Sequence, residues 1–220
     1  MKKDSALQNI LNKEEIRIIK SLNTPIKVQD FLDSIPFNFQ EEGQTYLSPR
    51  QVLKQNKAHC LEGALLAYLC LTYHGFEAYL LDLKVKKSAK LDSDHVVTLF
   101  KIGGGKQKFW GAISKTNHGV LRYRDPIFKN YKELARSFFH EYFLDSGEKT
   151  LQSFSKPLDI FKKFETKWTV DEEDLHYIAE YIDDSPHQDF VPKESRKYIR
   201  RAGDTEIKGA AIEEWAKDAK

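Results

Sequence analysis

Hydrophobic residues recur along this chain with a helical period at both ends and a strand pattern in the middle. Residues 5–22 place isoleucine and leucine at helical spacing among lysine and glutamate, which predicts a helix. Two further helices are predicted where a capping residue precedes a proline, over 26–35 after Thr24 and over 49–55 after Ser48.

The middle of the chain has the residue types of β-strands. Aromatic and aliphatic runs predict three strands over 76–85, 95–102 and 107–113, and a short fourth strand over 120–123. The lysine-rich stretch 84–90 and the glycine run 103–105 provide the turns between them.

Helical spacing returns after Pro126. It predicts four helices and a loosely attached amphipathic tail helix, over 131–143, 157–164, 171–183, 194–200 and 204–220. This order indicates an α+β fold, in which a central helix that begins at Cys60 packs on a small antiparallel sheet, flanked by helices from both ends of the chain. We expect residues 1–145 to form this core and residues 146–220 to form a mainly helical extension packed on it.

Composition narrows the class of protein. The 220 residues are 40% hydrophobic and 31% charged, with a net charge of +2, so neither a nucleic-acid nor a membrane partner is expected. No apolar run reaches the roughly 18 residues that cross a bilayer, and the charged N-terminus is unlike a secretory signal. We expect a cytoplasmic protein whose partner is a peptide or protein substrate.

The two cysteines have different surroundings. Both lie on a strongly apolar helix that is expected to end at Gly75, and Cys70, in its apolar middle, is typical of a core residue. The two thiols would be about 15 Å apart on this helix, beyond disulfide reach, so both are expected to be free. Cys60 follows polar residues and occupies the first turn, where backbone N–H groups and the helix dipole favour the thiolate. Gly63 on the same side permits another element to approach closely.

A histidine on a later strand can serve as the base for such a thiol. His95 opens the strand over 95–102, whose two faces are both apolar, so this strand is expected to be internal. A cysteine at a helix start and a histidine on a strand form a common thiol-enzyme pair. A core histidine held by hydrogen bonds is the structural alternative.

The third member of such a site orients the imidazole through its other nitrogen. We expect it near the end of the strand over 107–113, where the candidates are Ser114, Asn117 and Asp125. Asparagine can fill this role, and Asp125 has the charge, although it also suits a turn before Pro126.

Other residues are expected to contact the substrate. The oxyanion of an acyl-transfer intermediate needs hydrogen-bond donors, and the backbone N–H of Cys60 is the first candidate. An upstream side-chain amide, from Gln51, Gln55 or Asn56, is expected to supply the second donor. We also expect Trp110 and His59 to line the substrate site.

Metals and cofactors are not expected. His74 would lie about 21 Å along the helix from Cys60, and the chain has neither the C-x₂-C nor the H-E-x-x-H spacing of zinc sites. The glycine run joins two strands without a phosphate-loop pattern. A basic cluster is typical of a solvated loop and consists of Lys84, Lys86, Lys87 and Lys90.

These motifs together resemble the transglutaminase-like superfamily, which shares its Cys-His-Asp arrangement with papain-like thiol proteases. The resemblance covers residues 24–128 and rests on segments 58–64, 94–97 and 109–111 and on Gly75. It implies a helix packed on an antiparallel sheet and acyl transfer through a thioester, with Cys60 as nucleophile and His95 as base. The family motif ends its third strand in an aspartate, where this chain has Ser114.

Two functions are compatible with these residues. The first is a cysteine acyltransferase or hydrolase that acts on a peptide or a glutamine-type amide. The second, suggested by the serine at position 114, is a catalytically decayed module that binds a peptide or protein on the same scaffold.

Overall fold

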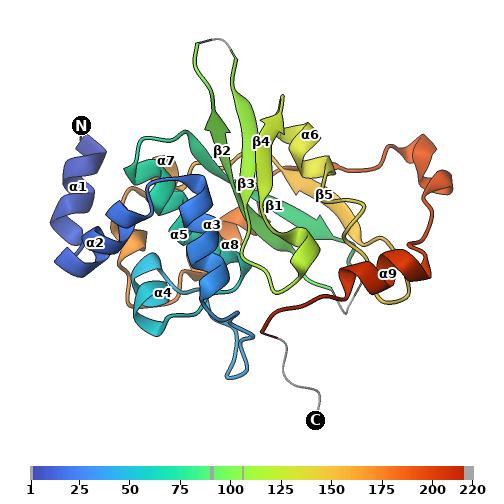
Figure 1. Ribbon diagram of the computed structural model, residues 1–220, viewed down its shortest axis with the longest axis horizontal. Coiled ribbons are helices and arrows are strands. Elements are labelled where there is room, and N and C mark those ends of the chain that lie inside the picture. Colours follow the sequence, from blue (N-terminus) through green and yellow to red (C-terminus); the bar gives the residue numbers. More distant parts are fainter. Residues whose placement is uncertain (1, 90–91, 106, 216–220) are drawn as a thin grey trace.

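The computed structural model describes residues 2–89, 92–105 and 107–215, and its centre is a six-stranded antiparallel sheet (Figure 1). The strand order is β4-β3-β2-β1-β5-β6. Three strands confirm the prediction: β1 (Ala78–Val85), β2 (His95–Ile102) and β3 (Phe109–Ile113). Strand β2 lies between β1 and β3, so the strand that carries His95 is internal, as its two apolar faces predict.

The edge of the sheet differs from the prediction. The prediction of a short strand over 120–123 is wrong. A 3₁₀ turn occupies Gly119–Leu121, and strand β4 (Arg124–Phe128) follows it. Strand β4 contains Pro126, which an edge strand tolerates because one side of its backbone needs no partner.

Two strands of the sheet come from the C-terminal part of the chain. Strand β5 (Leu151–Ser155) pairs with β1, and β6 (His187–Asp189) pairs with β5. The sequence analysis predicted neither strand, and it expected residues 146–220 to be an extension packed on a complete core. These residues instead complete the central sheet.

The N-terminal helices begin at identifiable caps. The single helix predicted over 5–22 is two helices, α1 (Lys2–Ile10) and α2 (Lys13–Ser21). Asn12 separates them, because its side chain accepts the backbone N–H of Glu15 at 2.9 Å and its own N–H binds the Glu15 carboxylate at 2.7 Å. Helices α3 (Pro25–Ser34) and α4 (Pro49–Gln55) begin at the predicted Thr24 and Ser48 caps.

The C-terminal helices are shorter than predicted. They are α6 (Tyr131–Arg136), α7 (Ile160–Phe164), α8 (His176–Asp183) and α9 (Asp204–Ala210), with a 3₁₀ helix over Lys193–Tyr198. Residues 216–220 of the expected tail helix lie outside the described residues. In the part of the chain that the structure describes, no helix is both long and apolar enough for a membrane span.

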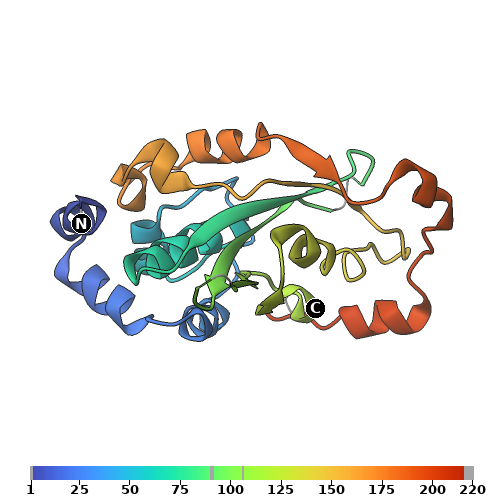
Figure 2. The same ribbon diagram turned by 90° about the horizontal axis from the view of Figure 1, so that it is seen from above.

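Apolar side chains cover both faces of the sheet. Helix α5 (Cys60–Tyr73) packs on one face, where it meets Val96 and Phe100 of β2. The alternate residues Val97 and Leu99 pack on the other face, with the aromatic residues that follow α6. Figure 2 shows the sheet between α7 and α8 on one side and α6 on the other. The predicted α+β fold, with the cysteine-bearing helix packed on an antiparallel sheet, is therefore confirmed.

Candidate active site

Cys60 is the first residue of α5, as predicted, and His59 is the N-cap of that helix. The Nδ1 atom of His59 accepts the backbone N–H of Leu61 at 3.2 Å. The backbone N–H of Cys60 belongs to the first turn, which has no intrahelical acceptors. The thiol therefore lies at the positive end of a buried helix, beside donors that can stabilise negative charge.

A buried carboxylate holds the segment before α5 in place. Glu62 is fully buried and accepts hydrogen bonds from the backbone N–H groups of His59 at 2.8 Å and Leu47 at 3.0 Å. The Thr45 hydroxyl and the Asn38 amide also donate to it, at 2.8 Å and 3.0 Å. Burial would raise the pKa of Glu62, but these hydrogen bonds and the nearby His59 lower it to about 2. Glu62 is thus an ionised anchor at the start of the helix.

The His59 ring joins this anchor to the thiol. Its Nε2 lies 2.8 Å from the Thr45 carbonyl oxygen and 3.3 Å from a carboxylate oxygen of Glu62. Its Nδ1 lies 3.9 Å from the Cys60 sulfur. Burial lowers the pKa of His59, but hydrogen bonds to Cys60 and Glu62 and their charges raise it to about 10.

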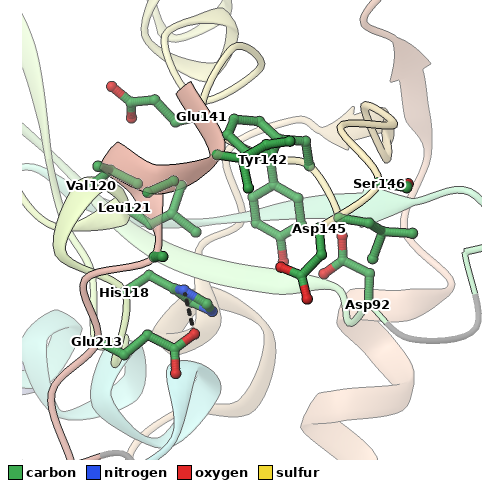
Figure 3. Close-up of a pocket in the computed structure, with 14 residues that line it drawn as sticks. Asp92, His118, Val120, Leu121, Glu141, Tyr142, Asp145, Ser146 and Glu213 are labelled. Carbon is green, nitrogen blue, oxygen red and sulfur yellow. Dashed lines mark ion pairs between the residues drawn. The ribbon is translucent and has the colours of Figure 1, made fainter. Parts of the chain in front are cut away.

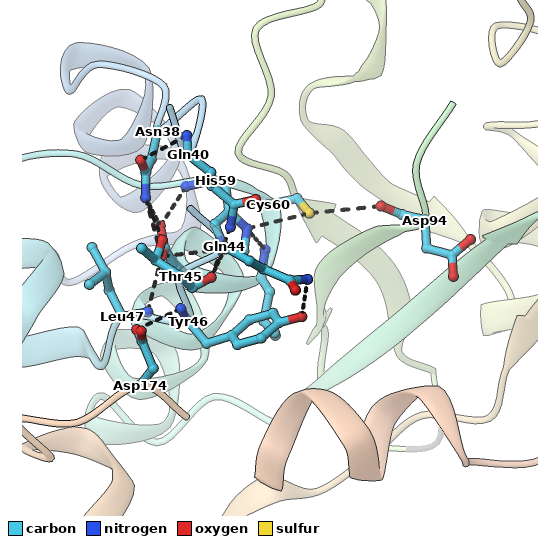
Figure 4. A network of polar contacts seen from close by, with 12 residues as sticks. Asn38, Gln40, Gln44, Thr45, Tyr46, Leu47, His59, Cys60, Asp94 and Asp174 are labelled. Atoms are coloured by element: carbon cyan, nitrogen blue, oxygen red, sulfur yellow. Dashed lines mark hydrogen bonds and ion pairs between the residues drawn. The ribbon is translucent and has the colours of Figure 1, made fainter. Parts of the chain in front are cut away.

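His95 is the second imidazole beside the thiol. It opens β2 and is buried, and the Cys60 sulfur lies 3.9 Å from the carbonyl oxygen of the preceding residue, Asp94 (Figure 4). Burial would raise the pKa of the Cys60 thiol, but hydrogen bonds to His59 and His95 and their positive charge lower it to about 5. At neutral pH this thiol is therefore predominantly the nucleophilic thiolate.

Ser114 occupies the third position of the site. Its hydroxyl oxygen lies 2.7 Å from Nε2 of His95, and both residues are buried. Because Nε2 is held in this way, Nδ1 is the ring nitrogen that remains for the thiol. Of the three candidates from the sequence, Ser114 is the one that the structure places against His95.

Gln29 fixes Ser114, and the sequence analysis did not find it. This buried α3 side chain donates to the Ser114 carbonyl at 2.9 Å and accepts the Ser114 N–H at 3.0 Å. The β2–β3 pairs run from Thr98–Ile113 to Ile102–Phe109, so Ser114 follows the last paired residue. Gln29 therefore supplies backbone partners to Ser114 where the ladder ends. No local pattern could have indicated a contact between residues this far apart in the chain.

Gly63 allows Lys115, the residue after Ser114, to approach helix α5 closely. A Cβ atom at Gly63 would lie 2.4 Å from Cβ of Lys115, so only glycine fits here. The ammonium group of buried Lys115 donates to the α3 carbonyls of Leu32 at 2.7 Å and Ile35 at 2.6 Å. This confirms the close approach predicted at Gly63 and shows which element makes it.

A cavity of about 540 Å³ opens beside the thiol. His59 and Cys60 line it together with Gln40, Gln44 and Tyr46. Gln40 is tied to the loop, since its amide donates to the Thr45 carbonyl at 2.8 Å, and the Gln44 amide donates to the Tyr46 hydroxyl. The amide side chains that line the thiol cavity therefore come from the loop before α4.

The expected oxyanion donors lie elsewhere. The Gln51 side chain donates to Glu172, and the Gln55 amide donates to Gln51 at 3.2 Å. Neither lines the cavity beside Cys60. Both residues belong to α4, and its C-cap Asn56 turns the chain, with φ of +51°, before the chain reaches Cys60.

Three other expected site residues are also placed away from the thiol. The Asn117 amide donates to Glu213 at 3.3 Å, and Asp125 is exposed on the edge strand β4. Trp110 packs under the Lys101 ammonium, 4.4 Å from its ring, and is absent from the residues that line the thiol cavity. Of the two expected substrate contacts, His59 lines the cavity and Trp110 does not.

A carboxylate cluster in the same cavity resembles a metal site. Oxygens of Asp82, Asp94 and Asp183 lie within 4.8 Å of one another. Two of these carboxylates already have cationic or imidazole partners, His187 at 3.0 Å from Asp82 and Lys84 at 2.6 Å from Asp183. The third, Asp94, accepts the backbone N–H of Val85 at 2.7 Å, so each carboxylate has a partner within the protein and we assign no metal to the cluster.

A separate cavity of about 340 Å³ lies behind Tyr142 (Figure 3). The C-terminal segment closes one side, where Glu213 lies 3.2 Å from His118. The Tyr142 ring packs 6.4 Å from the His95 ring, and its hydroxyl donates to the Ser93 carbonyl. Tyr142 thus forms the wall between this cavity and the imidazole.

Comparison with known proteins does not assign a family: the chain matches no family model and no curated relative. The function is therefore argued from the geometry around Cys60.

Proposed function

We propose that this protein is a transglutaminase-like cysteine enzyme that transfers or hydrolyses the acyl group of a peptide or glutamine-type amide. The contact chain of Cys60, His95 and Ser114 carries the proposal, because it joins a thiol of lowered pKa to a base and an orienting group. The free thiols of Cys60 and Cys70 suit a reducing compartment, and we place the protein in the cytoplasm as part of this proposal.

In this mechanism the Cys60 thiolate attacks the amide carbonyl carbon. A carbon–sulfur bond forms, and the carbonyl oxygen takes the negative charge beside the Cys60 backbone N–H. His95 in its protonated form gives the Nδ1 proton to the leaving nitrogen as the carbon–nitrogen bond breaks. The products of this half-reaction are a Cys60 thioester and a free amine or ammonia.

Water or an amine completes the cycle. His95, now neutral, takes a proton from the acceptor as it attacks the thioester carbonyl carbon, and the thiolate leaves. Ser114 keeps the imidazole oriented by binding Nε2, and Gln29 keeps Ser114 in place. The serine hydroxyl, unlike a carboxylate, brings no charge to balance an imidazolium.

The neutral hydroxyl of Ser114 favours a second candidate function, a binding module with a decayed site. A neutral hydroxyl at the third position stabilises the imidazolium less than the aspartate of the family motif would. Such a module would keep the cavity and bind a peptide without turnover.

Trapping of the acyl-enzyme separates the two candidates. The protein is incubated with glutamine-containing peptides and with peptide esters, quenched in acid and measured by intact-mass spectrometry. An acyl adduct on Cys60 that hydroxylamine removes, and that Cys60→Ala lacks, is the result expected for an enzyme. Saturable peptide binding without an adduct or released amine would instead identify the binding module.

A further inference from the structure

A third cavity, of about 530 Å³, is lined by residues of β5 and of the turn after β1, and it shares no lining residue with the cavity beside Cys60. The lysine-rich turn after β1 forms part of its rim through Lys86 and Lys87. The sequence alone indicated only a solvated loop here. The fold instead places two lysines of that loop beside Lys149 and Arg196, which come from distant parts of the chain.

The charge around this cavity is unbalanced. Its lining contains the four cations Lys86, Lys87, Lys149 and Arg196, and one carboxylate, Asp189. The lining thus carries a net charge of +3, and Glu148 beside Lys86 reduces the local excess to +2. Because like charges repel, a group of cations is unfavourable while the cavity is empty. A bound anion offsets this repulsion, so the grouping favours anion binding.

Two of the cations have acidic partners at the rim. Arg196 lies 2.8 Å from Asp189, and Lys86 lies 3.2 Å from Glu148. These pairs are largely exposed, so they are weak and can exchange with a ligand.

Lys149 is placed differently, because it is only 8% exposed. Its ammonium group donates to the carbonyl oxygen of His140 at 2.9 Å and lies 5.0 Å from the Phe143 ring centre. Burial lowers the pKa of Lys149 and outweighs the opposing effect of the nearby Glu206 carboxylate. A carbonyl dipole and a ring stabilise an ammonium less than a carboxylate or phosphate does, so an anion in the cavity would be a better partner.

The floor of the cavity is apolar. Phe139 and Leu151 are buried beneath it, and Val191 and Ile199 form its sides. A volume of this size with an apolar floor and a few convergent polar groups has the character of a small-molecule site.

We propose that this cavity binds a small amphipathic anion, with a carboxylate or phosphate at the cationic rim and an apolar body on the Phe139–Leu151 floor. Lys149 and Lys87 would bind the anionic group, together with Arg196 once it leaves Asp189. The proposal does not depend on the chemistry at Cys60.

Calorimetric titration of the full chain tests this proposal. The probes are octyl phosphate and octanoate, each kept below the concentration at which it forms micelles, with inorganic phosphate and 1-octanol as partial ligands. We expect at least one of the two amphipathic anions to bind at a single site, more weakly in high salt, and the partial ligands to bind about tenfold more weakly or not at all. Whichever of the two amphipathic anions binds more tightly then identifies the preferred headgroup.

Exposed residues serve as variants, because replacing the buried Lys149 can impair folding. Lys87→Gln and Arg196→Gln should each weaken binding about fivefold, since each removes one charge from the rim. The matched controls are Lys20→Gln, an exposed lysine on α2, and Arg17→Gln, an exposed arginine paired with Glu14. The controls should leave binding unchanged. Binding of 1-octanol as strong as that of octyl phosphate, equal losses in the controls, or no binding of either amphipathic anion would overturn the proposal.

Discussion

The Nε2 atom of His95 lies 2.7 Å from the hydroxyl oxygen of Ser114, a position that a carboxylate or an amide occupies in Cys-His-Asp and Cys-His-Asn enzymes. A serine hydroxyl can accept the Nε2 proton in a hydrogen bond and so fixes the ring, but it adds no charge. A second imidazole, His59, also lies beside the thiol, with its Nδ1 3.9 Å from the sulfur and its Nε2 3.3 Å from the buried carboxylate of Glu62.

Ser114→Ala should lower turnover of an amide or ester substrate by about tenfold, because it removes one orienting hydrogen bond. The loss in His95→Ala should be much larger, since that variant removes the base. Thr169→Val, which deletes another fully buried hydroxyl away from the site, serves as the control and should keep full activity. A loss in Ser114→Ala as large as in His95→Ala would mean that Ser114 does more than orient the ring.

His59→Asn should raise the apparent pKa of Cys60 by about 1–2 units, because the variant removes a positive neighbour of the thiolate. Asparagine is a good N-cap, but it loses the contacts of the His59 ring with Thr45 and Glu62, so a moderate loss of thermal stability is also expected. Thiol alkylation as a function of pH measures the shift. An unchanged alkylation profile would show that His59 acts only as the cap of α5.

Glu62→Gln should destabilise the protein by about 2–4 kcal/mol at pH 7, because four donors lose a charged acceptor. The folded-state pKa of Glu62 is lowered to about 2, so its ionisation stabilises the fold above the unfolded-state pKa. This contribution is lost as the pH falls from about 4.5 towards 2. Urea unfolding at neutral and at acidic pH measures how much stability each protein loses on acidification. This loss should be smaller in the variant than in the wild type, and an equal loss would contradict the assignment.

Gly63→Ala should destabilise the protein by about 1–3 kcal/mol, because the new methyl group overlaps the Lys115 side chain. It should also slow the alkylation of Cys60, since Lys115 directly follows Ser114. Gly209→Ala is the control, because a Cβ at that position in α9 meets no atom within 4 Å. The control should be neutral or slightly more stable, in line with the helix propensity of alanine. A neutral Gly63→Ala variant would show that Lys115 can move without cost.

The sequence predicts those parts of the fold that local chemistry determines. Thr24 and Ser48 mark helix starts because their side chains cap them, and Gly75 ends α5 because it adopts φ of +81°. Strands β5 and β6 were missed for a physical reason. Leu151–Ser155 is short and rich in serine and glutamine, and it becomes a strand because β1 offers a free edge.

The same limit applies to the site. Cys60 and His95 are recognisable because a helix start and a strand each give their residue a defined environment. Ser114 was one of three open candidates, and only the tertiary structure distinguishes it from Asn117 and Asp125. Gln29 and Gln44 were missed because their positions depend on contacts between segments that are far apart in the sequence.

The rate of iodoacetamide labelling at Cys60 as a function of pH, read by mass spectrometry, tests the central claim most directly. Cys70 is an internal reference, because it is fully buried and burial raises its pKa to about 12. We predict a midpoint near pH 5 for Cys60, consistent with its lowered pKa of about 5, and a clear upward shift in His95→Ala. A wild-type midpoint near the ordinary thiol value of about 8.5, or a midpoint that His95→Ala leaves unchanged, would contradict the Cys60–His95 pair.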